Sequence, residues 1–370
     1  MSREVIRLLH VFSTFAVGGP QSRFATLANA LGNKYHHQVI AMDGRYHAAK
    51  LLDHDAPVTC IPLNYEKGNA RTSLPLFRHT LKQINPHRLI TYNWGSIEWG
   101  LINLWRPIPH VHLEEGFGPE EIHSQIPRRV WMRRLALSRT PTIMVPSHHL
   151  YDIATKIWRF PAKRVHYLPN GVNIDRFHHQ PDATLLQRWQ LDPEQQCIIG
   201  TVTALRAEKN LSRLLRAFTE LKSNRPLRLV IIGDGPMRAT LESEAQQLGI
   251  ADQVLFLGHM DQPEHLISAF QIYALSSDTE QMPLGILEAM AAGVAVASVD
   301  VGDVRRMVSE PNQSYVSGTD NNALCQNLNR LIDDPALCNQ LGLANHEKAM
   351  QEYDLKLMLS RYDALFSTNR

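Results

Sequence analysis

Short apolar runs rich in Val, Ile and Leu alternate along the chain with amphipathic stretches of roughly helical length. A strand of a parallel sheet is covered by helices on both faces, so its apolar residues form a continuous run. This pattern therefore predicts parallel strands separated by helices. In the first half of the chain the runs fall at residues 5–12, 38–42, 58–63, 88–93, 109–113, 142–146 and 164–169.

A second series of apolar runs begins near residue 197 and falls at residues 197–205, 227–233, 254–258, 272–277 and 294–299. Between the two series, residues 170–195 are polar, rich in turn formers and without a strand pattern. Two successive series of this kind predict an α/β fold with two facing doubly wound, Rossmann-like domains. Ligands of such sheets bind beyond the carboxyl ends of the strands, so we expect the site in a cleft between the domains.

The domain boundaries follow from the same pattern. We place the first domain at residues 1–172 and the second at residues 173–350. Apolar spacings of three and four predict a final helix within residues 351–370, which could pack back on the first domain. The polar segment at residues 170–195 would then act as the hinge between the domains.

Composition narrows the class of protein. The 370 residues are 44% hydrophobic and 20% charged, and the net charge of +2 gives no reason to expect nucleic acid as a partner. The four cysteines show no Cys-x-x-Cys spacing, which favours free thiols in a reducing compartment. The first residues have no signal-peptide pattern, and no apolar stretch is long enough to span a bilayer. We therefore expect a cytoplasmic protein.

The loop after the first predicted strand contains Gly18 and Gly19, followed by Pro20 at the expected start of a helix. Glycines let the backbone approach a ligand closely, and the free N–H groups of a helix start favour an anion such as a diphosphate. The segment lacks the Gly-x-Gly-x-x-Gly spacing of dinucleotide sites. The alternative is a tight turn without a ligand.

Two further loops carry candidate groups. Arg206 and Lys209 follow the first strand of the second domain, where two cations could neutralise a diphosphate. Gly233 opens the turn "GDGP", in which Pro236 is expected at a helix start. Loop charges that are merely solvated, and a common strand-to-helix turn, are the alternatives.

The stretch "DTEQMPLGILEAMAAG" (278–293) places Glu280 and Glu288 on either side of Pro283. Proline favours the first turn of a helix, and Gly293 is a suitable helix stop. Glu280 would then lie on the loop, and Glu288 about one turn into the helix. The amides of Leu284 and Gly285 would point at a ligand, and the two carboxylates would accept hydrogen bonds from its hydroxyls. Each glutamate taken singly could be an ordinary surface residue.

Several motifs occur in a fixed order: "GGPQS", "PNGV", "R-x-x-K-N", "GDGP" and "E-x7-E" followed by "AMAAG". This set resembles the retaining nucleotide-sugar glycosyltransferases of family 4, whose fold is called GT-B. The motifs extend from residue 18 to residue 293 and so cover most of the chain. The resemblance implies that the first domain binds the acceptor and the second the nucleotide-sugar.

The resemblance also implies roles for single residues. Glu280 would hold the hydroxyls of the donor sugar and Glu288 those of the ribose. Arg206 and Lys209 would bind the diphosphate and stabilise it as it leaves, so that neither a metal nor another cofactor is needed beside a UDP- or GDP-sugar. The remaining donor contacts would come from Gly18, Gly19, Gly233, Leu284, Gly285, His259 and Met260.

Two departures from the family pattern stand out. Met282 and Pro283 occupy positions where the family often has Phe and Gly, and Pro283 supplies no N–H. The family often has a histidine in the loop after the strand at 109–113. His112 lies within that strand, where it would share a face with Glu114, while Glu115 occupies the loop position. Either His112 or Glu115 could act on the acceptor hydroxyl, and His112 could equally be a packed strand residue.

The segment at residues 126–137 is basic and amphipathic, with Arg128, Arg129, Arg133 and Arg134 beside Trp131. It could meet anionic lipid headgroups at the inner face of a membrane, or a phosphorylated acceptor. The alternative is a solvated helix whose tryptophan is buried.

We therefore expect a retaining, metal-independent hexosyltransferase that acts on a hydroxyl of a glycan or lipid-linked acceptor. A nucleotide-sugar epimerase or phosphorylase on a similar fold is the alternative enzyme class. A non-catalytic nucleotide-sugar-binding protein is the alternative outside enzymes.

Overall fold

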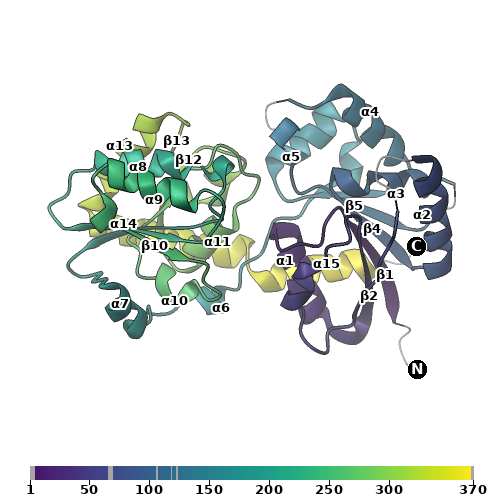
Figure 1. Ribbon diagram of the computed structural model, residues 1–370, viewed down its shortest axis with the longest axis horizontal. Helices are drawn as coiled ribbons and strands as arrows, with labels where there is room; N and C mark the ends of the chain where they lie inside the picture. Colours follow the sequence, from purple (N-terminus) through teal and green to yellow (C-terminus); the bar gives the residue numbers. More distant parts are fainter. Residues whose placement is uncertain (1–4, 66–69, 106, 118, 122–123, 368–370) are drawn as a thin grey trace. The chain divides into compact units, whose positions relative to one another are not determined.

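The computed structural model describes residues 5–65, 70–105, 107–117, 119–121 and 124–367. The chain forms two compact units, one of Met1–Pro169 with Met358–Arg370 and the other of Asn170–Leu357. Each unit is a parallel sheet with helices packed on it, as Figure 1 shows for both. The chain therefore passes between the units twice.

The first unit contains a seven-stranded sheet with the order β3-β2-β1-β4-β5-β6-β7, and its strand pairs are parallel. The order reverses between β1 and β4, which is the switch point of a doubly wound sheet. The strands are β1 (Ile6–Phe12), β2 (Tyr35–Ala41), β3 (Val58–Cys60), β4 (Arg88–Tyr92), β5 (His110–Leu113), β6 (Thr142–Val145) and β7 (Val165–Tyr167).

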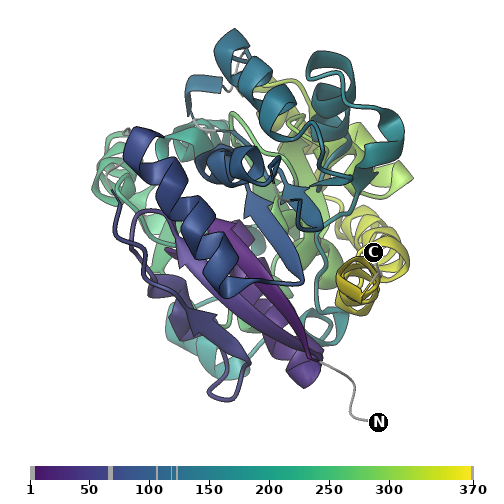
Figure 2. The same cartoon turned by 90° about the vertical axis from the view of Figure 1, so that its right-hand side faces the viewer.

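Helices cover both faces of this sheet, with α2 crossing the face turned to the viewer in Figure 2. The α-helices are α1 (Gly19–Leu31), α2 (Ala70–Ile84), α3 (Ile97–Ile102), α4 (Pro127–Ala136), α5 (His148–Asp152) and α15 (Leu355–Ser367). Short 3-10 turns lie at η1 (Gly32–Lys34), η2 (His47–Leu51), η3 (Trp94–Ser96), η4 (Pro119–Glu121) and η6 (Ala162–Arg164), and η5 (Ile153–Ile157) is a π-helical turn that continues α5.

Helix α15 packs on the first unit although it follows the whole second unit in sequence. Its Asp363 accepts hydrogen bonds from Lys34 Nζ at 2.6 Å and from Tyr35 Oη at 2.7 Å. Phe366 lies edge-on to Tyr35, with the ring centroids 5.6 Å apart. These contacts fix the helix against β2 and the turn before it.

The second unit contains a six-stranded parallel sheet with the order β10-β9-β8-β11-β12-β13, which reverses between β8 and β11. Its strands are β8 (Cys197–Val202), β9 (Leu227–Ile232), β10 (Val254–Gly258), β11 (Ile272–Leu275), β12 (Ala295–Val299) and β13 (Val316–Ser317). The pattern of apolar runs did not predict β13, because two residues are too few to form a recognisable run. The two Rossmann-like units agree with the predicted fold class.

The helices of the second unit also extend into the segment that we predicted as a polar junction. That segment contains α6 (Ile174–Phe177) and α7 (Ala183–Trp189), and α7 is capped by Asp182, whose carboxylate accepts from Thr184 N at 2.7 Å. The polar pattern of residues 170–195 did not predict these two helices, and the change of unit between Pro169 and Asn170 falls at the start of this segment. The remaining helices are α8 (Leu211–Thr219), α9 (Arg238–Gln247), α10 (Glu264–Ile267), α11 (Leu284–Ala291), α12 (Val304–Met307), α13 (Asn321–Ile332) and α14 (Pro335–Glu352), with 3-10 turns at η7 (Ala207–Lys209), η8 (Ala251–Gln253) and η9 (Glu310–Tyr315).

Alternate residues of the second sheet enter two separate apolar cores. Ile198, Val230 and Val296 belong to one cluster, and their neighbours Ile199 and Leu229 belong to the other. Because successive strand side chains point to opposite faces, this division shows that helices cover both faces. It explains why the strands read as continuous apolar runs.

Two further observations concern the whole described chain. The four cysteines are free, and three of them, Cys197, Cys325 and Cys338, are buried. Among the described residues, no helix combines the length and the apolar character that crossing a bilayer requires.

Candidate active site

The carboxyl ends of β8 and β11 bring two predicted residues together at the switch point of the second sheet. Lys209 follows β8, Glu280 follows β11, and the two strands are neighbours. Lys209 Nζ donates to Glu280 Oε1 at 2.6 Å, and Ser277 Oγ donates to the same oxygen at 2.8 Å. Both contacts use Oε1 of the Glu280 carboxylate. A cation and a carboxylate thus share the edge where open α/β sheets bind ligands.

The two loops are fastened to each other by further contacts around Asp278. Its backbone N–H donates to Glu208 O at 2.9 Å, and its carboxylate accepts from Asn210 Nδ2 at 2.9 Å and pairs with Arg213 at 2.8 Å. Arg213 also donates to Ser276 O at 2.7 Å. Arg213 was not predicted as a site residue. It lies on the first turn of α8, and its local sequence does not distinguish it from the other arginines of the predicted helices.

A third loop, after β12, closes on the backbone of Glu280. Gly302 has a φ of +56°, and a Cβ at this position would lie 2.4 Å from Glu280 O. Asp303 N donates to Gln281 O at 3.1 Å. Only glycine fits this approach without moving the loop that carries Glu280.

Arg206 lies at the same sheet edge but is not part of the ion pair. It precedes the η7 turn, its side chain is 58% exposed, and its guanidinium is 4.0 Å from Glu208 Oε1. Its exposed side chain is available for a ligand. The structure therefore places both predicted cations after β8, and only Lys209 contacts Glu280.

Helix α11 begins as the sequence suggested, with one adjustment. Pro283 is the N-cap, the helix runs from Leu284 to Ala291, and Gly293 adopts a φ of +73° after its end. Gly285 lies so close to β8 and β11 that a Cβ would come within 2.0 Å of Tyr273 Oη and 2.9 Å of Val202 O. The first turn of α11 is therefore held against the ends of two strands, and Leu284 remains exposed there.

Glu288 lies on α11, one turn inside the helix, and is largely buried there. Burial raises the pKa of its carboxyl from 4.5 to about 7, against the lowering effect of Arg176. Arg176 is itself paired with Glu264 at 2.6 Å, which limits this effect. Within the described chain, no hydrogen bond or ion pair holds the Glu288 carboxylate, so it has free acceptor capacity.

The other donor-site candidates of the second unit lie on neighbouring strand ends. Gly233 follows β9 with a φ of +137°, and its N–H donates to Gly258 O at 2.8 Å. His259 and Met260 follow β10; His259 is exposed and pairs with Asp261 at 3.1 Å, while Met260 packs partly on the apolar core. The expectation for Pro236 was wrong, because it lies in a turn and α9 begins only at Arg238.

In the first unit, Gly18 and Gly19 connect the loop after β1 to α1. Gly18 is the N-cap with an extended φ of −171°, Gly19 is the first helical residue, and Pro20 follows in the first turn. A Cβ on Gly19 would meet no atom within 4 Å. The backbone conformation therefore does not require glycine at either position, although both leave the start of α1 open.

Glu115 follows β5, and two neighbouring elements hold it. Its N–H donates to Asn93 Oδ1 at 2.6 Å, and its carboxylate forms an ion pair with Arg23 on α1. The side chains of Arg23 and Glu115 are 7% and 9% exposed. Asn93 and Arg23 were not predicted, because nothing in the local sequence relates them to Glu115.

His112 lies in β5, as the strand pattern predicted, and is fully buried. Its Nδ1 lies 2.8 Å from Thr91 Oγ1, and its Nε2 lies 3.5 Å from the carboxylate of Glu114. Glu114 is also fully buried and lies 3.6 Å from Arg133 Nε. Within the described part of the chain, neither Glu114 oxygen makes a hydrogen bond.

Arg133 connects this cluster to helix α4. It is 1% exposed, forms a two-pronged contact with Glu121 at 2.9 and 3.0 Å, and stacks near the rings of Trp94 and Trp158. The prediction that the arginines of α4 form an outward basic face was therefore wrong for Arg133. Arg129 pairs with Glu120 at 2.6 Å, and Arg134 donates to Ile157 O and Trp158 O.

Two family models match the chain. The model described as "Glycosyl transferase 4-like domain" matches residues 18–171, and "Glycosyl transferases group 1" matches residues 184–348. This chain belongs to the family 4 glycosyltransferases. The family assignment agrees with the resemblance found in the ordered motifs.

Known relatives agree with this assignment. Over 234 residues the chain is 24% identical to N-acetyl-alpha-D-glucosaminyl L-malate synthase of Bacillus anthracis, covering 63% of this chain and 61% of the relative. It is 28% identical over 222 residues to the GDP-mannose-dependent alpha-(1-6)-phosphatidylinositol monomannoside mannosyltransferase of Mycolicibacterium smegmatis, covering 57% and 58%. The matches thus span about 60% of these two relatives.

Among solved structures, HepE of Anabaena in complex with UDP and glucose superposes with a TM-score of 0.82 at 17% identity, covering 98% of this chain and 99% of HepE. This likeness shows the GT-B glycosyltransferase fold. Among the described residues of our chain, no group of three or more His, Cys, Asp or Glu side chains is placed to hold a metal ion.

Proposed function

We propose that this glycosyltransferase is a retaining hexosyltransferase that moves a hexosyl group from a UDP- or GDP-sugar to a hydroxyl of a glycan or lipid-linked acceptor. The observation that carries the proposal is the Lys209–Glu280 pair at 2.6 Å, beside the start of α11 and the switch point of the second sheet. Charges of both signs at one strand edge suit a ligand that has both a diphosphate and sugar hydroxyls.

Lys209 and Arg206 would receive the diphosphate. A lysine ammonium is a mobile point charge and an arginine guanidinium a planar fork, so together they can follow the charge that develops on the leaving group. These two cations supply the charge compensation that a divalent ion provides in other transferases. We therefore propose that transfer needs no metal or other cofactor.

Glu280 would hold the donor sugar. When Lys209 turns toward a diphosphate, Glu280 loses its cationic partner and can accept hydrogen bonds from sugar hydroxyls. The Ser277 hydroxyl and the backbone contacts of the loop keep the carboxylate in place during this exchange. Such positioning fixes the geometry of the bond that breaks.

Glu288 would accept hydrogen bonds from the ribose hydroxyls, and the amides of Leu284 and Gly285 would face the phosphates. Gly233, His259 and Met260 would supply the remaining contacts to the nucleotide. In the first unit, Gly18 and Gly19 would contact the phosphates and Glu115 would orient the acceptor hydroxyl. Buried His112 would act only through its contacts with Thr91 and Glu114.

The printed names of the relatives motivate the choice of donors and acceptors. The mycobacterial relative uses GDP-mannose and acts on a phosphatidylinositol monomannoside, whereas HepE was solved with UDP and glucose. We therefore propose UDP and GDP as the two bases to test first. We place the enzyme in the cytoplasm, where such donors are made and where its acceptors would be presented at a membrane.

The test is nucleotide release from UDP- and GDP-sugars with and without a panel of glycan and lipid-linked acceptors. We expect release that depends on the acceptor, a product with the anomeric configuration of the donor, and loss of release in Lys209→Met and Glu280→Gln. Lys222→Met, on an exposed loop, is the matched control and should keep full activity. Donor binding without release would identify a binding protein, and interconversion of donor sugars would identify an epimerase. Formation of a sugar phosphate from a glycan, when inorganic phosphate is added in place of the donor, would identify a phosphorylase.

A further inference from the structure

Four large apolar side chains on the helical layer of α3, α4 and η5 are exposed. Trp105 is 66% exposed, Trp131 60%, Ile157 45% and Leu135 38%. We call these four residues the apolar face. Single exposed apolar residues are ordinary, but a contiguous group is typical of an interaction surface.

The contacts between the elements show that the four residues lie on adjoining surface. Trp131 and Leu135 are four residues apart on α4 and therefore share one side of that helix. Arg134, between them in sequence, donates to Ile157 O at 2.7 Å. Arg139, just after α4, donates to Leu104 O at 3.0 Å and so brings the end of the helix beside Trp105.

A groove continues from Trp105 between α2 and α3. It has a volume of about 590 Å³, and Leu74, Leu81, Ile102 and Ile108 are among its lining residues. The charged residues of its lining are Arg78 and Lys82, together with His79. An apolar groove with a cationic rim suits a ligand that has a hydrocarbon portion and an anionic head.

The charge of this region differs from that of the chain as a whole. Residues 127–169 contain nine Lys and Arg residues and one acidic residue, Asp152, whereas the whole chain has a net charge of +2. Arg129 and Arg133 are used in pairs with Glu120 and Glu121. The remaining exposed cations of this range are Arg128, Arg139, Lys156, Arg159 and Lys163. The acidic residues near them are Asp152, which pairs with Lys156, and Glu98 on α3.

We propose that the apolar face docks the first unit on a lipid bilayer that contains anionic lipids. Tryptophan favours the membrane interface because its ring is apolar and its N–H is polar. The surrounding Lys and Arg residues would meet the anionic headgroups, each contributing to the attraction. A protein partner or a second copy of this chain would not by itself require this excess of cations around the tryptophans.

The test is flotation of the full-length protein with vesicles of phosphatidylcholine alone and with vesicles containing phosphatidylglycerol. We expect binding only to the anionic vesicles, with weaker binding as salt increases. Trp131→Ser and Trp105→Ser should each lower the partition coefficient by about tenfold or more, because each removes a large buried apolar area. Arg128→Gln and Lys156→Gln should each lower it by about fivefold.

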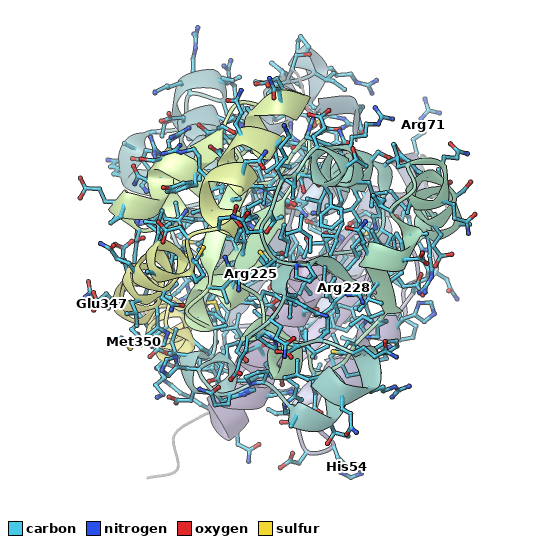
Figure 3. The ribbon with its side chains drawn as sticks, turned by 90° about the vertical axis from the view of Figure 1, so that its left-hand side faces the viewer. His54, Arg71, Arg225, Arg228, Glu347 and Met350 are labelled. Carbon is cyan, nitrogen blue, oxygen red and sulfur yellow. The ribbon has the colours of Figure 1, made fainter. Side chains whose placement is uncertain are left out.

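The matched control uses exposed apolar residues of the second unit. Leu343 and Met350 on α14 are 62% and 45% exposed, and Figure 3 labels Met350 on that helix. Leu343→Ser and Met350→Ser should leave the partition coefficient unchanged. Thermal unfolding of each variant checks that the substitutions have not unfolded the unit.

Three results would overturn the proposal. The first is equal binding to neutral and anionic vesicles. The second is vesicle binding that Trp131→Ser leaves unchanged. The third is a protein that does not bind vesicles but self-associates, with Trp131→Ser abolishing the self-association. The assay contains neither donor nor acceptor. Its outcome is therefore independent of whether the proposed sugar transfer is correct.

Discussion

Each unit carries a carboxylate–cation pair at the carboxyl edge of its sheet, and the two pairs are built differently. Arg23 and Glu115 join the element after β1 to the end of β5, with side chains 7% and 9% exposed. Lys209 and Glu280 join the element after β8 to the end of β11, with side chains 21% and 11% exposed. The pair in the first unit is a more buried pair with a planar guanidinium, and the pair in the second has a more exposed, mobile ammonium.

The surroundings of the two pairs differ as well. Next to Glu115 in sequence lies the buried carboxylate of Glu114, 3.6 Å from the buried Arg133, which Glu121 holds in place. The loop that carries Glu280 is packed closely against its neighbours at Gly302, and the helix after it at Gly285. Both lie on an apolar core. A loop held through its backbone leaves its side-chain charges able to change partners. We infer that the second unit holds the pair that exchanges with substrate, and the first unit a pair that keeps its geometry.

The largest loss of stability is expected when Arg133 is replaced. Arg133→Met leaves the buried carboxylate of Glu114 without its nearby cation and removes the two-pronged contact to Glu121, which keeps only Arg129 at 3.1 Å. This variant should lower the free energy of unfolding of the first unit by about 3–5 kcal/mol. Urea unfolding followed by intrinsic tryptophan fluorescence measures this loss, because five of the six tryptophans lie in the first unit. Arg129→Met removes a more exposed pair with Glu120 and leaves Glu121 held by Arg133, so it should lower the free energy of unfolding by about 1 kcal/mol or less. Equal losses in the two variants would show that the buried charges do not stabilise this edge.

The next effect separates the two glutamates of the second unit. Glu280→Ala should lower kcat by roughly 10²-fold or more, since the carboxylate positions the sugar at the breaking bond. Glu288→Ala should mainly raise KM, because a ribose contact is the same in the ground and transition states. Steady-state kinetics on one donor and acceptor measures both. A Glu280→Ala enzyme with nearly unchanged kcat would mean that this glutamate is only a loop residue.

Glu115→Gln extends the comparison to the first unit. If Glu115 only holds Arg23, the variant should lower the melting temperature and leave kcat within about threefold of the parent. If it acts on the acceptor hydroxyl, as proposed, kcat should fall by roughly 10²-fold or more, and the loss should depend on pH. Comparing the loss of kcat in Glu115→Gln with that in Glu280→Ala shows which of the two pairs contacts the reacting groups.

A smaller effect concerns the stability of the second unit as a function of pH. Burial raises the pKa of Glu288 from 4.5 to about 7, so the unfolded chain releases this proton at a lower pH than the folded chain does. The ionised carboxyl therefore destabilises the fold progressively from pH 4.5 to about 7, and fully above that. The free energy of unfolding of Glu288→Gln, relative to that of the parent protein, should therefore rise by on the order of 1–3 kcal/mol when the pH is raised from 4.5 to 8.

Urea unfolding at the two pH values measures this gain. Glu347→Gln on α14, a residue labelled in Figure 3, is the matched surface control and should gain nothing. A constant difference between Glu288→Gln and the parent at both pH values would contradict the raised pKa.

The smallest effect is expected from a chelator. Because Lys209 and Arg206 can balance the diphosphate charge, EDTA should change the rate of transfer by less than about twofold. The rate is measured before and after addition of magnesium or manganese. Activity that disappears with EDTA and returns with manganese would show that the two cations are insufficient.

The apolar pattern predicted most of the fold. Each of the twelve runs predicted as strands coincides with or overlaps an observed strand, because strands covered on both faces must be continuously apolar. The pattern failed where an element is too short to have a period, as with β13. It also failed at α7, whose capping by Asp182 and partly exposed surface resemble a polar loop in sequence.

The candidate site was predictable only where its residues are close together in the sequence. Glu280, Pro283 and Glu288 lie within nine residues, so their arrangement on a loop and a helix follows from helix-start rules. The Arg23–Glu115 pair joins residues 92 apart, and the Thr91–His112 contact depends on the pairing of β4 with β5. Such contacts depend on tertiary packing, which a single sequence does not specify.

The sequence order of the two units has a consequence for synthesis on the ribosome. The second unit, Asn170–Leu357, is continuous in the chain, whereas the first needs α15, whose Asp363 and Phe366 contact Lys34 and Tyr35. A nascent chain emerges from its first residue onward, so the first unit is synthesised early but remains incomplete until α15 has emerged. The second unit can fold before that point. The part of this protein that is translated first is therefore completed last.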